Sequence, residues 1–488
     1  MNIKNIVYTS IKVIITFLWV IMIFILIKNN YPSKIFKNNY NSTYIDNSLM
    51  KDEWMGIYFN KKKIGYSHWM MVPDKDKNIF LINEQSFMSF IAGGENIKLR
   101  MNNIAIVSPD LKLKEFTSYL FTSQYKLKIE GKVSENNLNI KFVSDKSAKY
   151  YSIPLKEIPS IAGNINQYIL SKGLTVNSKY IFPYYDPFTF SNKNITINVE
   201  KKEQIEIYGE MMDAYKVRED YDGIIIYTWL KEDGTRLREE SPMGFILQRE
   251  RQDDALNIPD ANDRIDIIKS TGILTEKLIN DPREIKYLKI EIGGIKTDGF
   301  SHLDHGRQRI SKNTLEIFSL PLKDEKADNS DLFMESSVFI QSDDTSIKNK
   351  AKEIIGNEND DYKKAELISR WLFENIKKKI TISIPDAVSI LRLKRGDCNE
   401  HATLFCALAR SVNLPAKICV GLLYSEDGFY YHAWNEVFTG GQWISVDSVF
   451  NQIPADATHI KFIEGELAQQ MDILKIIGQI QIKILEYK

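Results

Sequence analysis

Cys398 is the residue whose type and position most clearly suit nucleophilic chemistry. It follows Gly396 and Asp397, and an almost wholly apolar run begins behind it, which predicts a buried helix that starts at or near the cysteine. A thiol at a helix start meets the positive end of the helix dipole and unpaired backbone N–H groups. Because both favour the thiolate, Cys398 is a candidate nucleophile.

A nucleophilic thiolate needs a base, and His432 and Asp447 stand on two predicted strands. Gly440-Gly441 between these strands is a signal for a two-residue hairpin turn. If Thr439 pairs with Gln442, His432 and Asp447 share one face as diagonal neighbours, with backbones roughly 5 to 8 Å apart. A carboxylate at that distance can orient an imidazole that serves a nucleophile.

Other residues compete for these roles. Cys406 and Cys419 lie inside an apolar helix and strand and are expected to be buried and inert. His401 is three residues from Cys398, so it is an alternative base or, with Cys398 and His432, an alternative zinc ligand. The missing fourth ligand favours a packed histidine that supports the site from outside.

The segments GDCNEHA, HAWNEV and WISVD resemble those of the transglutaminase-like superfamily of papain-like cysteine enzymes, in order and approximate spacing. The segment NQIPADATHIKF behind them is similar to bacterial members. The resemblance covers residues 330–488. It implies that Cys398 is the nucleophile, that His432 is the general base and acid, and that Asp447 orients the histidine. We expect no cofactor and no metal.

Two departures from the family concern the oxyanion and calcium. No glutamine precedes Cys398 closely, so its backbone N–H is the only oxyanion donor we assign. Trp371 is a conceivable second donor, but a tryptophan on an amphipathic helix favours a core position. Trp434 and Trp443 are likewise expected to pack. The chain has no loop of alternating acidic ligands, so calcium dependence is not implied.

The amino terminus predicts membrane attachment. Residues 13–27 are fifteen residues without a charge, and a helix over 6–27 would be long enough to span a bilayer. No small-residue cleavage site follows, so we expect an uncleaved anchor rather than a cleaved signal or a buried helix. Residues 30–48 are polar and Asn-rich and indicate a tether. The C-terminal region is expected to lie outside the cytoplasm.

The remaining sequence divides into three parts after the anchor and tether at 1–47. Residues 48–265 show apolar alternation of period two, which predicts an antiparallel meander or half-barrel. Residues 266–329 indicate a short β section and a linker, and residues 330–488 a mixed catalytic domain. The predicted fold class is α+β: an N-terminal transmembrane helix, a β-rich domain and a C-terminal transglutaminase-like α+β domain.

One motif in the short β section invites a metal interpretation. His302-Leu303-Asp304-His305 offers two imidazoles and a carboxylate beside Gly306. Further ligands are missing and the segment has the composition of a loop, which favours a surface turn.

Composition limits the function classes. The chain has 488 residues with 64 basic and 64 acidic side chains, so its net charge predicts no nucleic-acid binding. We expect a membrane-anchored cysteine enzyme that attacks amide bonds of a protein or peptide substrate through a thioester, with hydrolysis favoured. The alternatives are a protein-crosslinking transglutaminase and a non-catalytic assembly protein whose β-rich domain binds a protein partner.

Overall fold

The structure is a computed structural model that describes residues 50–488 except 124, 145–146, 260–263 and 323–332. The expected membrane helix and tether at 1–47 lie outside the described residues. Within the described residues, no helix combines the length and apolar character that a membrane crossing requires.

The predicted α+β fold class is wrong, because the protein is mostly β. Strands hold 48% of the described residues and helices 20%. The physical reason is that the period-two alternation continues through one very large sheet, and further strands follow it. The helices gather mainly between α5 (Thr345–Ile355) and α8 (Cys398–Ser411). A transmembrane helix is no part of the fold described here.

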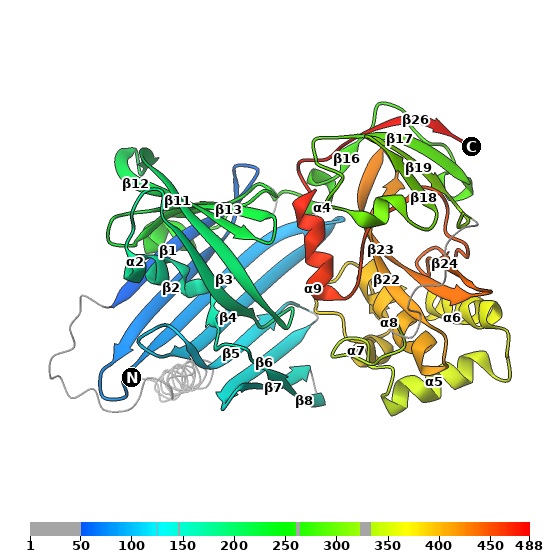
Figure 1. The fold of residues 1–488 in the computed structure, drawn as a ribbon, viewed down its shortest axis with the longest axis horizontal. Coiled ribbons are helices and arrows are strands. Elements are labelled where there is room, and N and C mark those ends of the chain that lie inside the picture. The colour runs from blue at the N-terminus through cyan, green and yellow to red at the C-terminus, as the bar shows by residue number, and fades with distance from the viewer. Residues whose placement is uncertain (1–49, 124, 145–146, 260–263, 323–332) are drawn as a thin grey trace, which may run out of the picture. The chain divides into compact units, whose positions relative to one another are not determined.

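The large sheet has fifteen strands, and its order has two arms that meet at a central seam. Figure 1 shows the strands β1 to β8 of one arm. One arm runs from β1 to β8 and the other from β15 back to β9, each by consecutive neighbours. The seam is the antiparallel pairing of β1 with β15, where Met55 lies opposite Arg249. The strands are β1 (Lys51–Phe59), β2 (Lys62–Asp74), β3 (Ile79–Ala92), β4 (Glu95–Val107), β5 (Leu113–Phe121), β6 (Lys126–Ser134), β7 (Asn137–Ser144), β8 (Ser147–Pro154), β9 (Ser160–Ile161), β10 (Lys179–Asp186), β11 (Ser191–Ile207), β12 (Glu210–Tyr221), β13 (Ile224–Leu230), β14 (Arg236–Glu240) and β15 (Phe245–Arg249).

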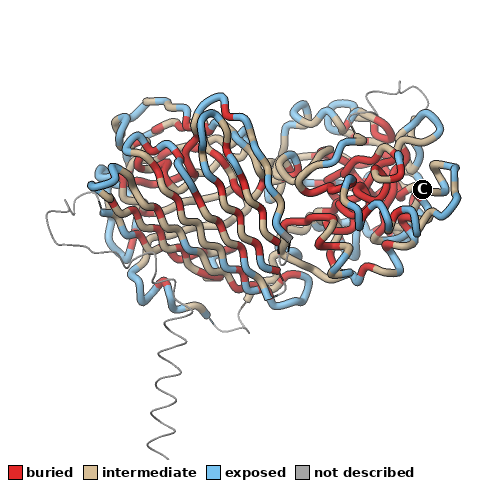
Figure 2. The backbone as a smooth tube through the Cα atoms, turned by 90° about the horizontal axis from the view of Figure 1, so that it is seen from below, coloured by how far each residue is buried: buried red, intermediate tan, exposed pale blue. Residues whose placement is uncertain are grey.

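Alternation in the sequence explains these strands. Leu127 and Ile129 on β6 are buried, whereas Lys126 at the start of the same strand is exposed, and Ile129 lies opposite Phe142 on β7. Successive side chains point to opposite faces of a strand, so one face becomes apolar. Figure 2 shows this pattern as short buried and partly buried stretches along the strands. Three short helices, α2 (Ile165–Lys172), α3 (Gln252–Leu256) and α4 (Ile267–Ser270), connect or flank the sheet.

The C-terminal part contains a five-stranded sheet of order β16-β23-β22-β25, with β24 paired to β23. A second sheet has the order β18-β19-β17-β26, so the short β section pairs with the C-terminal strand. The remaining elements are β16 (Ile273–Leu274), β17 (Tyr287–Gly293), β18 (Gln308–Ser311), β19 (Thr314–Phe318), α6 (Asp361–Asn375), β20 (Lys377–Lys378), α7 (Ala387–Leu393), β21 (Arg395–Gly396), β22 (Ala416–Ser425), β23 (Gly428–Thr439), β24 (Gln442–Val446), β25 (His459–Glu464), α9 (Leu467–Gln470) and β26 (Gln481–Tyr487).

One hydrophobic core unites the C-terminal elements. It extends in sequence from Ile279 to Ile484 and includes the buried face of α8. Phe405 and Leu408 on that helix are fully buried, and Asn435 of β23 donates to the carbonyl of Ala402 at 3.0 Å. The core therefore fixes α8 against the strand that carries His432.

Candidate active site

The helix start at Cys398 is confirmed. Asp397 is the N-cap, and its side chain accepts a hydrogen bond from the N–H of Asn399 at 3.0 Å. Glu400 completes a capping box by accepting from the N–H of Asp397 at 2.9 Å. A Cβ at Gly396 would lie 2.2 Å from that of Glu400, so only glycine permits this close turn.

The predicted hairpin register is also confirmed. Thr439 pairs with Gln442, and the register continues to Asn435 opposite Val446. Gly440 and Gly441 both have positive φ, +60° and +82°, as a type I′ turn requires. The turn thus sets which side chains of β23 and β24 share a face.

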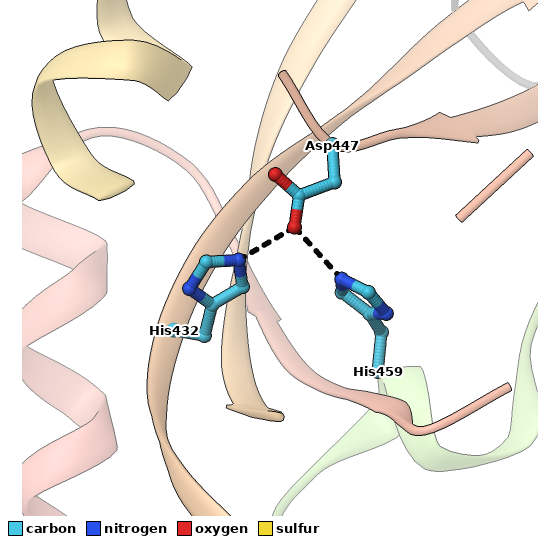
Figure 3. A group of neighbouring side chains, drawn as sticks. All are labelled: His432, Asp447 and His459. Carbon is cyan, nitrogen blue, oxygen red and sulfur yellow. Dashed lines mark hydrogen bonds and ion pairs between the residues drawn. The ribbon is translucent and has the colours of Figure 1, made fainter. Parts of the chain in front are cut away.

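His432 and Asp447 are brought together as this register predicts. Nε2 of His432 lies 2.7 Å from Oδ2 of Asp447, and both side chains are buried (Figure 3). The second oxygen of Asp447 accepts from the N–H of Val449 at 2.7 Å. Because Nε2 is committed to the carboxylate, Nδ1 of His432 is the nitrogen left for proton exchange.

Cys398 lies beside the same strand. The backbone N–H of Ala433, the residue next to His432, is close enough to the sulfur to favour its thiolate form. The hydroxyl of Tyr431 donates to the side-chain oxygen of Asn399 at 2.7 Å, which ties the first turn of α8 to β23. No hydrogen bond joins the thiol to the His432 ring in the described part of the chain; such contacts often tighten only in a substrate complex.

The electrostatics of Cys398 differ from the sequence expectation. Burial raises the pKa of the Cys398 thiol, and Asp397 raises it further, although the N–H of Ala433 opposes the shift. The helix start is present, but desolvation of the sulfur outweighs it. The thiol is therefore protonated at rest, and its proton must pass to a base during reaction.

The capping carboxyls limit negative charge beside that sulfur. Burial raises the pKa of Asp397 well above its ordinary value, and the neighbouring Glu400 raises it further. Like charges so close do not both ionise readily, which disfavours the ionised form of Asp397.

Sequence reasoning missed His459. Its Nε2 lies 2.9 Å from Oδ2 of Asp447, the oxygen that His432 also contacts (Figure 3). His459 is fully buried on β25, which pairs with β22. The segment NQIPADATHIKF carried the only signal, as a family resemblance without a role for the histidine.

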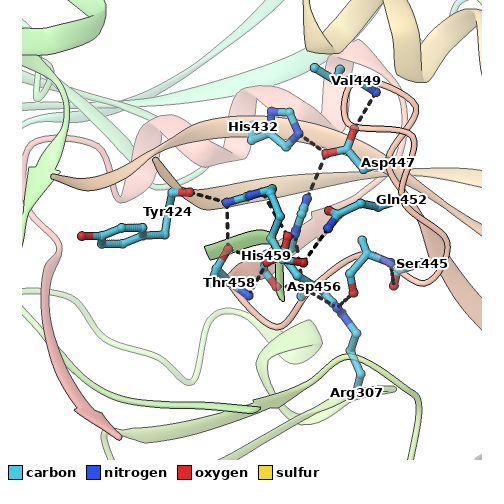
Figure 4. A network of polar contacts seen from close by, with 12 residues as sticks. Arg307, Tyr424, His432, Ser445, Asp447, Val449, Gln452, Asp456, Thr458 and His459 are labelled. Carbon is cyan, nitrogen blue, oxygen red and sulfur yellow. Dashed lines mark hydrogen bonds and ion pairs between the residues drawn. The ribbon is translucent and has the colours of Figure 1, made fainter. Parts of the chain in front are cut away.

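A buried polar chain continues behind His459. Its Nδ1 lies 3.3 Å from Oδ1 of Asp456 (Figure 4). The guanidinium of Arg283 lies 3.0 Å from the other oxygen of Asp456. Burial alone would raise the pKa of Asp447, but His432 and His459 outweigh it and hold that pKa well below its usual range. Asp447 is thus a firmly ionised carboxylate.

The imidazole of His459 responds in the opposite direction. Burial would lower its pKa, yet Asp456 and Asp447 raise it above the ordinary value. His459 lies between two carboxylates, so a positive charge there is stabilised.

The short β section contacts the segment that carries Asp456 and His459. The buried guanidinium of Arg307 donates to the carbonyls of Ala455 and Asp456, both at 2.9 Å, and to that of His459 at 2.7 Å. Gln308 donates to the carbonyl of Lys461 at 2.9 Å. These contacts fix the segment that carries Asp456 and His459.

The His302-Leu303-Asp304-His305 motif has a structural place. Leu303 is fully buried, and Nδ1 of His302 lies 3.6 Å from a carboxylate oxygen of Glu464. Asp304 accepts from the N–H of Ile310 at 3.3 Å. The segment is a short 3-10 turn, and it packs the short β section against β25.

The other candidates have different environments. Nδ1 of His401 lies 2.7 Å from the carbonyl of Asp397 on its own helix, and burial lowers its pKa. Cys406 and Cys419 are fully buried, and Trp434 is 1% exposed. Trp371 packs at the edge of the core, with Nζ of Lys350 5.7 Å from its ring.

Within the part of the chain that the structure describes, two groups of side chains have the spacing of metal ligands. The ligand atoms of His432, Asp447 and His459 lie within 4.8 Å of one another. In this arrangement both imidazoles are at hydrogen-bond distance from one carboxylate oxygen, which requires the protons that a metal would replace. The second group is Cys419, Glu436 and Glu464, where the ammonium group of Lys461 already serves as the cation, 2.7 Å from Glu464.

Residues 348–448 match the family model of the transglutaminase-like superfamily. The chain therefore carries a transglutaminase-like domain, and the matched residues include Cys398, His432 and Asp447. An uncharacterised protein of Haemophilus influenzae is 26% identical over 121 residues, which are 24% of this chain and 32% of that protein. The chain thus spans about a third of the length of that relative.

Solved structures of low sequence identity are also similar. A "putative cysteine protease" from Cytophaga hutchinsonii is 19% identical and covers 43% of this chain and 80% of its own, with a TM-score of 0.27. A β-barrel-like protein from Brucella abortus is 8% identical, covers 42% and 96%, and has a TM-score of 0.34. The periplasmic domain of TgpA from Pseudomonas aeruginosa is 15% identical, covers 30% and 64%, and has a TM-score of 0.22.

Proposed function

We propose that the protein is a cysteine hydrolase that cleaves amide bonds in a protein or peptide substrate. The observation that carries the proposal is the contact of His432 with Asp447 at 2.7 Å, beside the helix start that holds Cys398. In such a site the thiol is the nucleophile, the imidazole is its base, and the carboxylate orients the imidazole.

The proposed reaction begins when the thiol proton of Cys398 passes to Nδ1 of His432 as the sulfur attacks the carbonyl carbon. The backbone N–H of Cys398 stabilises the oxyanion. The C–N bond then breaks, the imidazolium gives its proton to the leaving amine, and a thioester remains. His432 next takes a proton from water, whose oxygen replaces the sulfur, so an acid and the free thiol are released.

The test is product analysis with a defined peptide mixture. The compact unit Ser48–Lys488 should release new carboxyl termini, and Cys398→Ala should release none. Added primary amine separates the two resolving steps, because hydrolysis gives the acid even when amine is present, whereas a crosslinking enzyme gives the amide. Exclusive amide formation would replace hydrolysis by transamidation.

The rival is a non-catalytic assembly or binding protein. Catalysis requires a reactive thiol at Cys398, whereas a binding protein does not. A Cys398 that resists alkylation in the native protein would therefore favour this rival. The proposal also places the protein at a membrane, outside the cytoplasm, on the strength of the apolar run 13–27. A protein that leaves the membrane fraction in plain buffer would refute that location.

A further inference from the structure

Lys378 stands beside the candidate nucleophile. The two-residue strand β20 pairs in parallel with β21, and this pairing sets Lys378 against Gly396, two residues before Cys398. The N–H of Lys379 donates to the carbonyl of Gly396 at 3.0 Å. The backbone of Lys378 is therefore fixed next to the turn that leads into α8.

Two aromatic rings hold the Lys378 side chain toward the site. Its Nζ lies 4.3 Å from the ring centre of Phe373 and 5.8 Å from that of Phe450. The Phe450 ring lies 5.9 Å from the His432 ring. Phe373 and Phe450 are 40% and 37% exposed, so both rings are accessible from solvent.

Lys378 has no carboxylate partner at ion-pair distance among the described residues. Neighbouring Lys379 pairs with Glu95 at 3.5 Å, and Arg283, whose guanidinium lies 4.7 Å from the Phe450 ring, pairs with Asp456. For Lys378, the described residues provide ring contacts but no ion pair.

The buried carboxylate of Asp447 does not serve as the ion-pair partner of Lys378. This carboxylate already contacts His432 and His459. Its interaction with Lys378 is electrostatic and acts over a longer distance. Burial lowers the pKa of Lys378, and the charge of Asp447 opposes that shift. An exposed cation within electrostatic reach of the site remains open to an incoming anion.

We propose that Lys378 binds a carboxylate of the substrate close to the scissile amide, so that the site selects acidic acyl donors. This inference rests on the proposed function and names its substrate class. Phe450 lies between the lysine and His432, and its exposed ring offers the apolar surface on which the substrate chain can lie. The lysine sets specificity and takes no part in proton transfer.

The test compares two alkylating agents that differ in charge. Purified full-length protein is treated with iodoacetate, which carries a carboxylate, and with neutral iodoacetamide, and labelling of Cys398 is followed by mass spectrometry. We expect Lys378→Gln to lower the ratio of iodoacetate to iodoacetamide rates roughly three- to tenfold, because the local cation is lost. The iodoacetamide rate should stay close to that of the wild type.

Lys377→Gln is the matched control. It removes the same charge one residue away on the same strand, where the side chain points to the other side. The ratio should change much less than in Lys378→Gln, and Lys378→Arg should retain it.

The outcomes separate the two proposals. An unchanged ratio in Lys378→Gln, or equal loss with both reagents, overturns the inference, since equal loss means that the lysine acts on the thiol itself. If neither reagent labels Cys398 in the native wild-type protein, the proposed function fails as well. Labelling with an unchanged ratio leaves the proposed function standing.

Discussion

His459 contacts the carboxylate of Asp447, with Nε2 of the histidine 2.9 Å from Oδ2 of the aspartate. That oxygen also contacts His432, while Oδ1 receives the N–H of Val449. The carboxylate is thus fixed by donors on both oxygens, and it cannot rotate without losing one of them. A fixed Asp447 keeps Nδ1 of His432 in one direction.

His459→Gln should weaken this arrangement without removing the base. We expect the rate of Cys398 alkylation at pH 7 to fall roughly tenfold in this variant. Asp447→Asn removes the orienting carboxylate itself and should lower turnover by roughly 10² to 10⁴. The pH profile of alkylation should also move, which simple loss of packing would not cause. His302→Gln, a histidine outside this chain of contacts, should leave rate and profile unchanged.

His401→Gln decides between the two candidate bases. Because Nδ1 of His401 contacts the Asp397 carbonyl on its own helix, we expect at most a roughly tenfold loss of turnover. If this variant is inactive while His432→Ala remains active, the base lies on α8 and the strand-borne assignment is wrong.

Alkylation should distinguish the three cysteines. Cys398 is half-buried, whereas Cys406 and Cys419 are fully buried, so iodoacetamide should label only Cys398 before denaturation. Because burial raises the pKa of Cys398, fast labelling at pH 7 requires His432 to accept the proton. His432→Ala should slow labelling by roughly tenfold or more. Uniform labelling of all three cysteines would contradict the assignment.

The pH dependence of stability should carry a contribution from His459. Its folded pKa is raised, so the contribution is complete below the unfolded value of about 6.5 and is lost as pH rises through the folded pKa. The difference in Tm between wild type and His459→Gln should therefore be larger at pH 6 than at pH 9. Thermal unfolding at the two pH values measures it, and a difference that grows toward pH 9 would reverse the assigned sign.

The buried ion cluster on the strands predicts a large effect of Lys461→Met. Nζ of Lys461 lies 2.8 Å from Glu436 and 2.7 Å from Glu464, and Lys417 contacts both carboxylates. Removing one cation leaves an uncompensated buried charge, which should cost about 3–5 kcal/mol in the free energy of unfolding.

Two further variants control this result in denaturant titrations. Adding Glu436→Gln to Lys461→Met restores neutrality and should recover part of the loss. Lys112→Met removes an exposed lysine that pairs with Asp110 and should change stability by less than about 1 kcal/mol. If Lys461→Met alone left the free energy of unfolding unchanged, the cluster would tolerate an uncompensated charge and the prediction would be wrong.

The parts of the site that the sequence predicted are those set by local rules. The glycine turn determines the register between His432 and Asp447, and the cap at Asp397 determines where α8 begins. His459 could not be predicted in this way, because its position depends on β25 pairing with β22, including a register shift between Val420 and Gly421. Pairings between distant segments leave no periodic signal in the sequence.

Two other differences have the same origin. The pKa of Cys398 depends on burial by the completed fold, whereas the sequence revealed only the helix start. The α+β class failed because alternation identifies strands but does not say that fifteen of them join one sheet. Both quantities belong to the assembled protein rather than to any segment of it.

The seam between β1 and β15 has a consequence for the order of folding. Within each arm of the large sheet, most neighbours are consecutive hairpins, which close short loops and form fast. The seam joins Met55 to Arg249 and closes a much longer loop, at a greater entropic cost. We therefore expect two separately nucleated meanders that zip together along β1 and β15 as a late step.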